Sequence, residues 1–117
     1  MALSGGSLDD GYFNSIPIGF SFYYMSLPYS TISASTNGWI TFDQVITNSL
    51  LTNNLNSGAT RPVIAPLWDD ILLQLNTNFS YQTSGTSPNR VFTAEWLNMR
   101  WNYSASGNTI SFQVKLY

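Results

Sequence analysis

The chain has 117 residues, 44% of them apolar, which is enough to bury one hydrophobic core, so we expect a single domain over residues 1–117. Only 9% of the residues are charged, whereas about 25% is usual in soluble domains. The four basic residues are scattered and the net charge is −2, which argues against a nucleic-acid partner, because phosphate binding needs clustered Lys and Arg. The chain contains neither Cys nor His, which excludes disulfides, thiolate metal sites and histidine-dependent catalysis.

The balance of polar and charged residues favours a secreted protein, because Ser, Thr, Asn and Gln must provide the solubility that charges usually provide. No apolar run approaches the length of a membrane span. The first six residues lack the basic and apolar regions of a signal peptide. An extracellular location would therefore require that the chain be a mature or excised fragment.

Alternation of apolar and polar residues predicts short strands in the first half of the chain. Ile16–Tyr24 places its Ile and Phe residues on one face, and Ser26–Ser30 has the composition of a turn. Thr31–Thr36 and Trp39–Asp43 are predicted strands joined by a tight turn at Asn37-Gly38, because both residues tolerate positive φ.

The middle of the chain begins with a loose, Asn-rich region, residues 44–61, in which Leu50-Leu51 is predicted to form one turn of helix. Val63–Trp68 is a nearly continuous apolar run and is predicted as a strand. Shorter strands are predicted at Ile71–Gln74 and Phe79–Gln82.

The last third has the clearest pattern. Ser84–Asn89 is predicted as a turn, Arg90–Tyr103 as one long strand or two strands with a bend, and Ser104–Asn108 as a hairpin loop. Thr109–Tyr117 alternates throughout, with Ile110, Phe112, Val114 and Leu116 predicted to face inward. About seven to nine short strands at this spacing predict an all-β fold, an antiparallel, jelly-roll-like β-sandwich.

Two adjacent carboxylates, Asp69 and Asp70, follow the apolar run and allow three interpretations. A catalytic pair would need Glu95 as the partner, because neighbours on a strand point to opposite faces. A calcium site is the second interpretation, with Asp43 and the Asp9-Asp10 pair as further oxygen donors. We favour the third, in which a carboxylate ends the strand by accepting backbone N–H bonds.

Aromatic residues make up 15% of the chain and point to a binding surface. Sugar rings stack on exposed aromatic side chains, while nearby amide and carboxylate groups bond the hydroxyls. Trp68 and Trp96 are more simply explained as framework residues. The candidate ligand-binding residues are Trp101, Tyr103, Tyr23, Tyr29 and Glu95.

Five blocks in order carry a resemblance to a known family. They are IPIGFSFYY (16–24), TISASTNGWITF (31–42), RPVIAPLWDDI (61–71), SPNRVFTAEWLN (87–98) and NTISFQVKLY (108–117). Together they resemble a β-sandwich domain of large secreted cell-surface proteins of Bacteroidetes-type bacteria, which often carry a type IX secretion sorting signal. The pattern is also distantly similar to nidogen-type extracellular domains.

The resemblance implies a non-catalytic extracellular binding or adhesion module, with carbohydrate as a candidate ligand. Members of the family usually have one strand before the Asp9–Gly11 block and another after the last block, and neither is expected here. The final strand would then have an open edge, a template for strand addition. A structural subunit that assembles through this edge, at Thr109, Ser111, Gln113 and Lys115, is therefore the alternative function.

Overall fold

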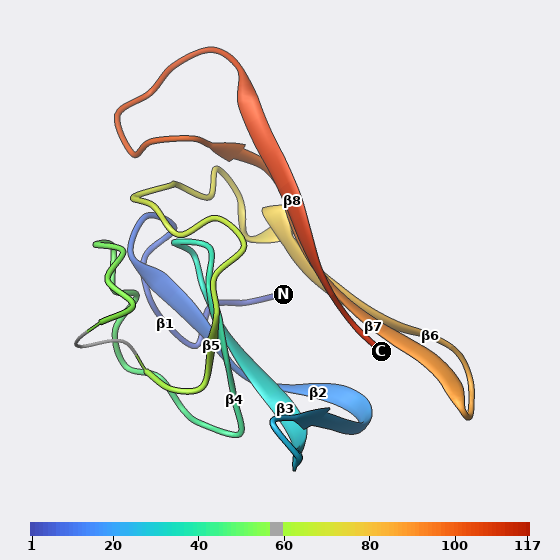
Figure 1. The fold of residues 1–117 in the computed structure, drawn as a ribbon. Coiled ribbons are helices and arrows are strands. Elements are labelled where there is room, and N and C mark those ends of the chain that lie inside the picture. The colour runs from blue at the N-terminus through green and yellow to red at the C-terminus, as the bar shows by residue number, and fades with distance from the viewer. Residues whose placement is uncertain (57–59) are drawn as a thin grey trace.

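The computed structural model describes residues 1–56 and 60–117, and eight strands of this part form two antiparallel sheets (Figure 1). The first sheet has the order β1-β2-β3-β4-β5, with strands at Gly5–Gly6, Gly11–Tyr24, Leu27–Ser35, Ile40–Phe42 and Val63–Ile64. The second has the order β6-β7-β8, at Phe79–Thr86, Asn89–Arg100 and Thr109–Leu116, and a 3-10 turn, η1, precedes it at Asn76–Asn78. The all-β sandwich is confirmed. In each sheet the strands follow chain order, as in a meander, rather than the interleaved order of a jelly roll.

The turn between β3 and β4 forms where Asn37-Gly38 predicts it. The N–H of Gly38 donates to the carbonyl of Ser35 at 3.2 Å, and Gly38 has a φ of +80°. A Cβ atom at this position would lie 1.9 Å from the carbonyl oxygen of Leu67. Only glycine therefore allows this turn to pack so closely on the segment that follows β5.

The predicted strand Val63–Trp68 is much shorter in the structure, because β5 ends at Ile64. Pro66 has no N–H to donate to a ladder. Trp68 lies beyond the end of β5 and packs on Trp39, with ring centroids 5.9 Å apart, while its indole N–H donates to the carbonyl of Leu50 at 2.6 Å. Tertiary packing thus replaces strand pairing here.

Four other sequence-based predictions of local structure need correction. The turn predicted at Ser26–Ser30 lies at Met25-Ser26, both with positive φ, so that β3 already begins at Leu27. Ile71–Gln74 contributes only an isolated bridge between Leu72 and Arg100. Leu50-Leu51 is not helical, and a two-residue strand, β1, does precede the Asp9–Gly11 block.

A β-bulge in β7 interrupts the alternation of side-chain faces near the end of the strand. The register with β8 shifts between Trp96 and Met99, and Asn98 has a φ of +57°. One extra residue reverses the alternation, so Met99 is fully buried, whereas an unbroken strand would place it on the outer face with Thr93 and Glu95. Trp96 is buried as framework, as predicted.

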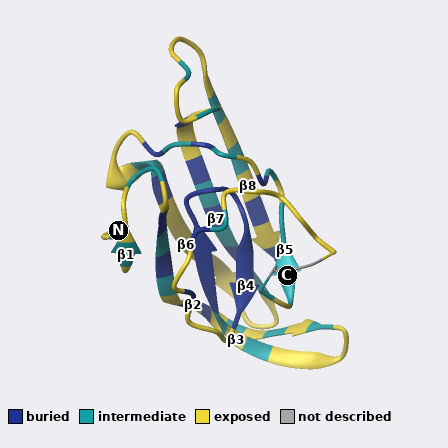
Figure 2. Cartoon of the chain, turned by 90° about the vertical axis from the view of Figure 1, so that its left-hand side faces the viewer, coloured by how far each residue is buried: buried dark blue, intermediate teal, exposed yellow. Residues whose placement is uncertain are grey.

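The core lies between the two sheets, where buried positions concentrate on β3, β4 and the middle of β7 (Figure 2). Phe13 of β2 stacks on Phe79 of β6 with ring centroids 4.5 Å apart. The indole N–H of Trp96 crosses the sandwich to donate to the carbonyl of Ser35 at 3.1 Å. These contacts fix the inner face of the second sheet and leave its outer face to solvent.

Candidate functional site

The outer face of the second sheet carries a row of polar side chains. Phe79, Phe92 and Val114 point into the core, so the residues between them point outward. The register places Ser80, Glu95 and Gln113 side by side across the three strands. A second row lies two residues away along each strand and consists of Gln82, Thr93 and Lys115. We call these six residues, together with Ser84, the polar face.

The polar face is hollowed. A shallow depression of about 400 Å³ lies over it, and Tyr81 of the edge strand β6 also lines this hollow. The carboxylate of Glu95 accepts a hydrogen bond from the Gln113 amide at 2.6 Å, which orients both groups. Hydroxyl, amide, carboxylate and ammonium groups therefore line one concave surface, a combination that offers both donors and acceptors to a ligand.

The aromatic candidates do not form one site. Trp101 and Tyr103 follow β7 and are 56% and 54% exposed. Tyr23 is 66% exposed and belongs to the β2–β3 hairpin. Figure 1 shows the segment after β7 at one end of the molecule and this hairpin at the other. The prediction of Tyr29 as an exposed platform was wrong. Its side chain is half-buried, because its ring packs 5.1 Å from that of Phe42.

The predicted edge of β8 is an edge in the structure. The sheet order places β8 next to β7 alone among the described strands. Thr109, Ser111, Gln113 and Lys115 are all exposed, and the residues between them face the core. Gln113 and Lys115 also belong to the polar face, so one strand carries both candidate surfaces.

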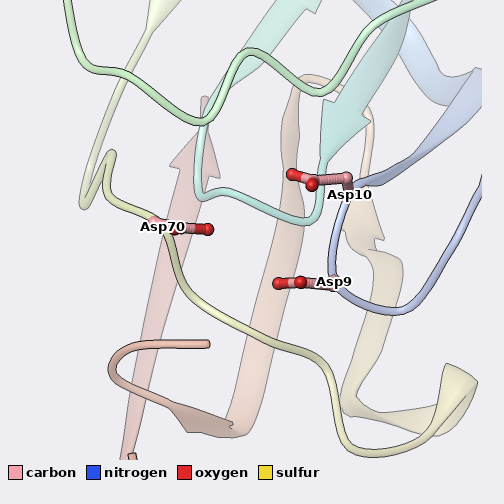
Figure 3. Close-up of side chains that lie close together, drawn as sticks. All are labelled: Asp9, Asp10 and Asp70. Carbon is pink, nitrogen blue, oxygen red and sulfur yellow. The ribbon is translucent and has the colours of Figure 1, made fainter. Parts of the chain in front are cut away.

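Three carboxylates meet at the end of the molecule where the β3–β4 turn lies. Asp9 and Asp10, from the loop between β1 and β2, point toward Asp70, from the connection between the sheets (Figure 3). One oxygen atom from each lies within 4.8 Å of the others. Such a set of hard oxygen donors could hold a cation. We call Asp9, Asp10 and Asp70 the acidic cluster.

The electrostatics of the acidic cluster are unfavourable without a cation. Burial and the charges of Asp10 and Asp70 raise the pKa of Asp9 above its usual value. Burial and the charges of Asp10 and Asp69 raise the pKa of Asp70 in the same way. Both shifts mean that the fold penalises the charged forms.

Asp69 has a different role from Asp70. Its carboxylate accepts the N–H of Asp70 at 2.8 Å, and its side chain is exposed. This is the local backbone bond that the strand-ending interpretation predicts. Asp69 lies outside the acidic cluster.

Sequence reasoning missed most residues of the polar face. Ser80, Gln82 and Ser84 alternate with apolar or small residues in β6, so a period-2 pattern was available as a signal. The pairing of β6 and β8 on either side of β7, which brings these residues beside Gln113 and Lys115, is not visible in a local pattern.

The fold and these surfaces define a small antiparallel β-sandwich with a concave polar sheet face. All 117 residues match the family model described as NIDO related, so the chain belongs to the nidogen-related family. Membership indicates an extracellular module. The chain matches no curated protein and no solved structure. In residues 1–56 and 60–117 there is no helix with the length and apolarity to cross a membrane.

Proposed function

We propose that this domain is a non-catalytic binding module of a bacterial cell-surface protein and that it recognises carbohydrate on the polar face. The observation that carries the proposal is the hollow over β6, β7 and β8, with polar groups in cross-strand register along it. The five sequence blocks that resemble bacterial surface proteins support the cellular setting.

The chemistry of the lining favours a neutral polyhydroxyl ligand. Each sugar hydroxyl both donates and accepts, and the Ser, Thr and Gln side chains of the polar face do the same. The face has one carboxylate, Glu95, and one ammonium, Lys115. Because these two charges balance, the surface offers no net attraction to a strongly anionic ligand.

Binding rather than hydrolysis fits the same lining. Glycoside hydrolysis requires two carboxyl groups that flank the scissile bond. Glu95 is the single acidic residue among those that line the hollow. The chain has no histidine to serve as a general base in its place.

A glycan array followed by calorimetric titration of the best ligand tests this proposal. We expect Gln82→Ala and Glu95→Gln each to weaken binding about tenfold, because each removes one ligand hydrogen bond or its charge assistance. Trp101→Ala and Tyr103→Ala are the matched controls, since both are exposed residues beyond the polar face, and they should bind like the parent chain.

Two results would count against the proposal. Failure of every glycan to bind would reject carbohydrate as the ligand. Loss of binding in Trp101→Ala or Tyr103→Ala, with Gln82→Ala unchanged, would move the site to the segment after β7 and reject the polar face.

One observation favours assembly as a second candidate function. Both outer strands of the second sheet, β6 and β8, pair only with β7 among the described strands. A strand of a neighbouring chain could add to either edge through main-chain hydrogen bonds. In this alternative the domain is a subunit of an oligomer, filament or adhesin stalk.

A further inference from the structure

Two buried oxygen atoms at the acidic cluster have no hydrogen-bond donor. One is Oδ1 of Asp9, and the other is Oδ1 of Asn37, a residue that is fully buried in the β3–β4 turn. Buried acceptors without a partner are rare in native proteins, and each calls for an explanation such as a bound ion.

The Asn37 side chain is directed at the acidic cluster. Its Nδ2 atom donates to Oδ1 of Asp10 at 3.1 Å, so the amide of Asn37, whose own oxygen has no partner, lies directly against the cluster. The hydroxyl of Ser49 donates to the same Asp10 oxygen at 3.0 Å, which holds this carboxylate in place. The oxygens of the acidic cluster and of Asn37 therefore come from three separate segments: the loop between β1 and β2, the β3–β4 turn and the connection between the sheets.

We propose that the acidic cluster, together with the side-chain carbonyl of Asn37, is a calcium site. The cation would neutralise three carboxylates that otherwise repel one another and would give both orphan oxygens a partner. It would also tie the loop between β1 and β2 to the connection between the two sheets.

The donor set selects the type of metal. All of the donors are oxygens, and the chain has no Cys or His to favour zinc or copper. Calcium accepts six to eight oxygens at about 2.3–2.6 Å in variable geometry. Oxygens within 4.8 Å of one another fit such a shell. Donors on separate loops suit calcium better than magnesium, which demands a near-ideal octahedron.

The first test is thermal unfolding of the whole chain after dialysis against a chelator. We expect the Tm to rise with added calcium chloride up to about 10 mM, a range that includes the weak sites of extracellular modules. The same concentration of magnesium chloride should give a smaller rise. If the Tm does not rise with calcium, the proposal is overturned. Water molecules or protons would then be the partners of the two unpaired oxygens.

Asp70→Asn gives the sharper result, because its two effects have opposite signs. Without calcium the variant should melt above the parent chain, since one of the repelling charges is gone. With calcium its Tm should no longer rise. Asp9→Asn should show the same two changes in Tm as Asp70→Asn. Agreement between the two variants would exclude a folding defect that is specific to one position.

Two further variants serve as controls. Asp43→Asn removes one negative charge far along the chain from the acidic cluster, and it should keep the full calcium response. Asp69→Asn changes the adjacent carboxylate and should also keep it. A calcium response that disappears in Asp69→Asn but persists in Asp9→Asn would assign the ion to the Asp69-Asp70 pair instead and overturn the proposed site.

Discussion

At the scale of single residues, Asp43 shows how an exposed carboxylate can organise the strand beside it. Its Oδ1 atom accepts the N–H groups of Ser30 and Thr31 at 3.0 and 2.7 Å, and also bonds both hydroxyls. Desolvation alone would raise the pKa of Asp43, but these hydrogen bonds outweigh it and lower the pKa below its ordinary value of 3.8.

This lowered pKa predicts an acid-dependent loss of stability. The folded pKa lies below the unfolded value of 3.8, so the contribution is complete above that pH and disappears as the pH falls through the folded pKa. We expect Asp43→Asn to cost about 1 kcal/mol at pH 7, because Asn keeps the left-handed backbone (φ +47°) but not the charge. Urea unfolding of both chains at several pH values measures the difference. If the difference in unfolding free energy between the two chains stayed constant at acid pH, this prediction would be wrong.

At the scale of elements, the β6–β7 hairpin is attached to the first sheet through few polar bonds. The hydroxyl of Thr83 donates to the carbonyl of Ile18 at 2.7 Å. The guanidinium of Arg90 donates to the carbonyl of Gly19 at 3.1 Å and lies over the ring of Phe20. Because β6 is otherwise mostly exposed, these bonds fix the angle of the strand that carries three of the seven residues of the polar face.

Thr83→Val removes one of these bonds while keeping the shape of the side chain. We expect a loss of about 1 kcal/mol in unfolding free energy, because the partly buried carbonyl of Ile18 loses its donor. Thr93→Val makes the same change on the outer face of β7 and should be nearly neutral. Denaturant midpoints of the two variants measure the difference, and equal values would show that the bond contributes nothing.

How far the sequence predicts these elements depends on the range of the interactions. The alternation in β8 and the Asn37-Gly38 turn are local signals, and both predictions are confirmed. The face of Met99 depends on a bulge, and the shortness of β5 depends on the packing of Trp68. Neither is encoded in a short window of sequence, which is why the strand predicted at Val63–Trp68 was too long.

The candidate sites depend even more than the strands on contacts between residues that are distant in sequence. Asp9 and Asp70 are far apart in sequence and meet only because the β1–β2 loop and the inter-sheet connection lie at the same end of the sandwich. Carboxylate pairs are visible in the sequence, but which of them converge is set by topology. The polar face likewise requires the register of all three strands.

At the scale of the whole molecule, the open edges of the second sheet separate the two candidate functions. Strand addition is favoured by a long, flat, apolar edge. The outward residues of β8 are polar, and Lys115 places a charge near its end. On β6 every residue after Phe79 is exposed, and most of them are polar. Such edges resist pairing, so we expect light scattering to give the 13.0 kDa monomer across a wide range of concentration.

A mass that grows with concentration would reverse this conclusion in favour of assembly. Thr109→Lys then identifies the edge, because a second charge on β8 should return the mass to the monomer value without touching the polar face. Its thermal unfolding serves as the control, since Thr109 is exposed and its substitution should leave the Tm unchanged. Assembly that survives Thr109→Lys would instead assign the contact to β6, because that strand has the other unpaired edge of the same sheet.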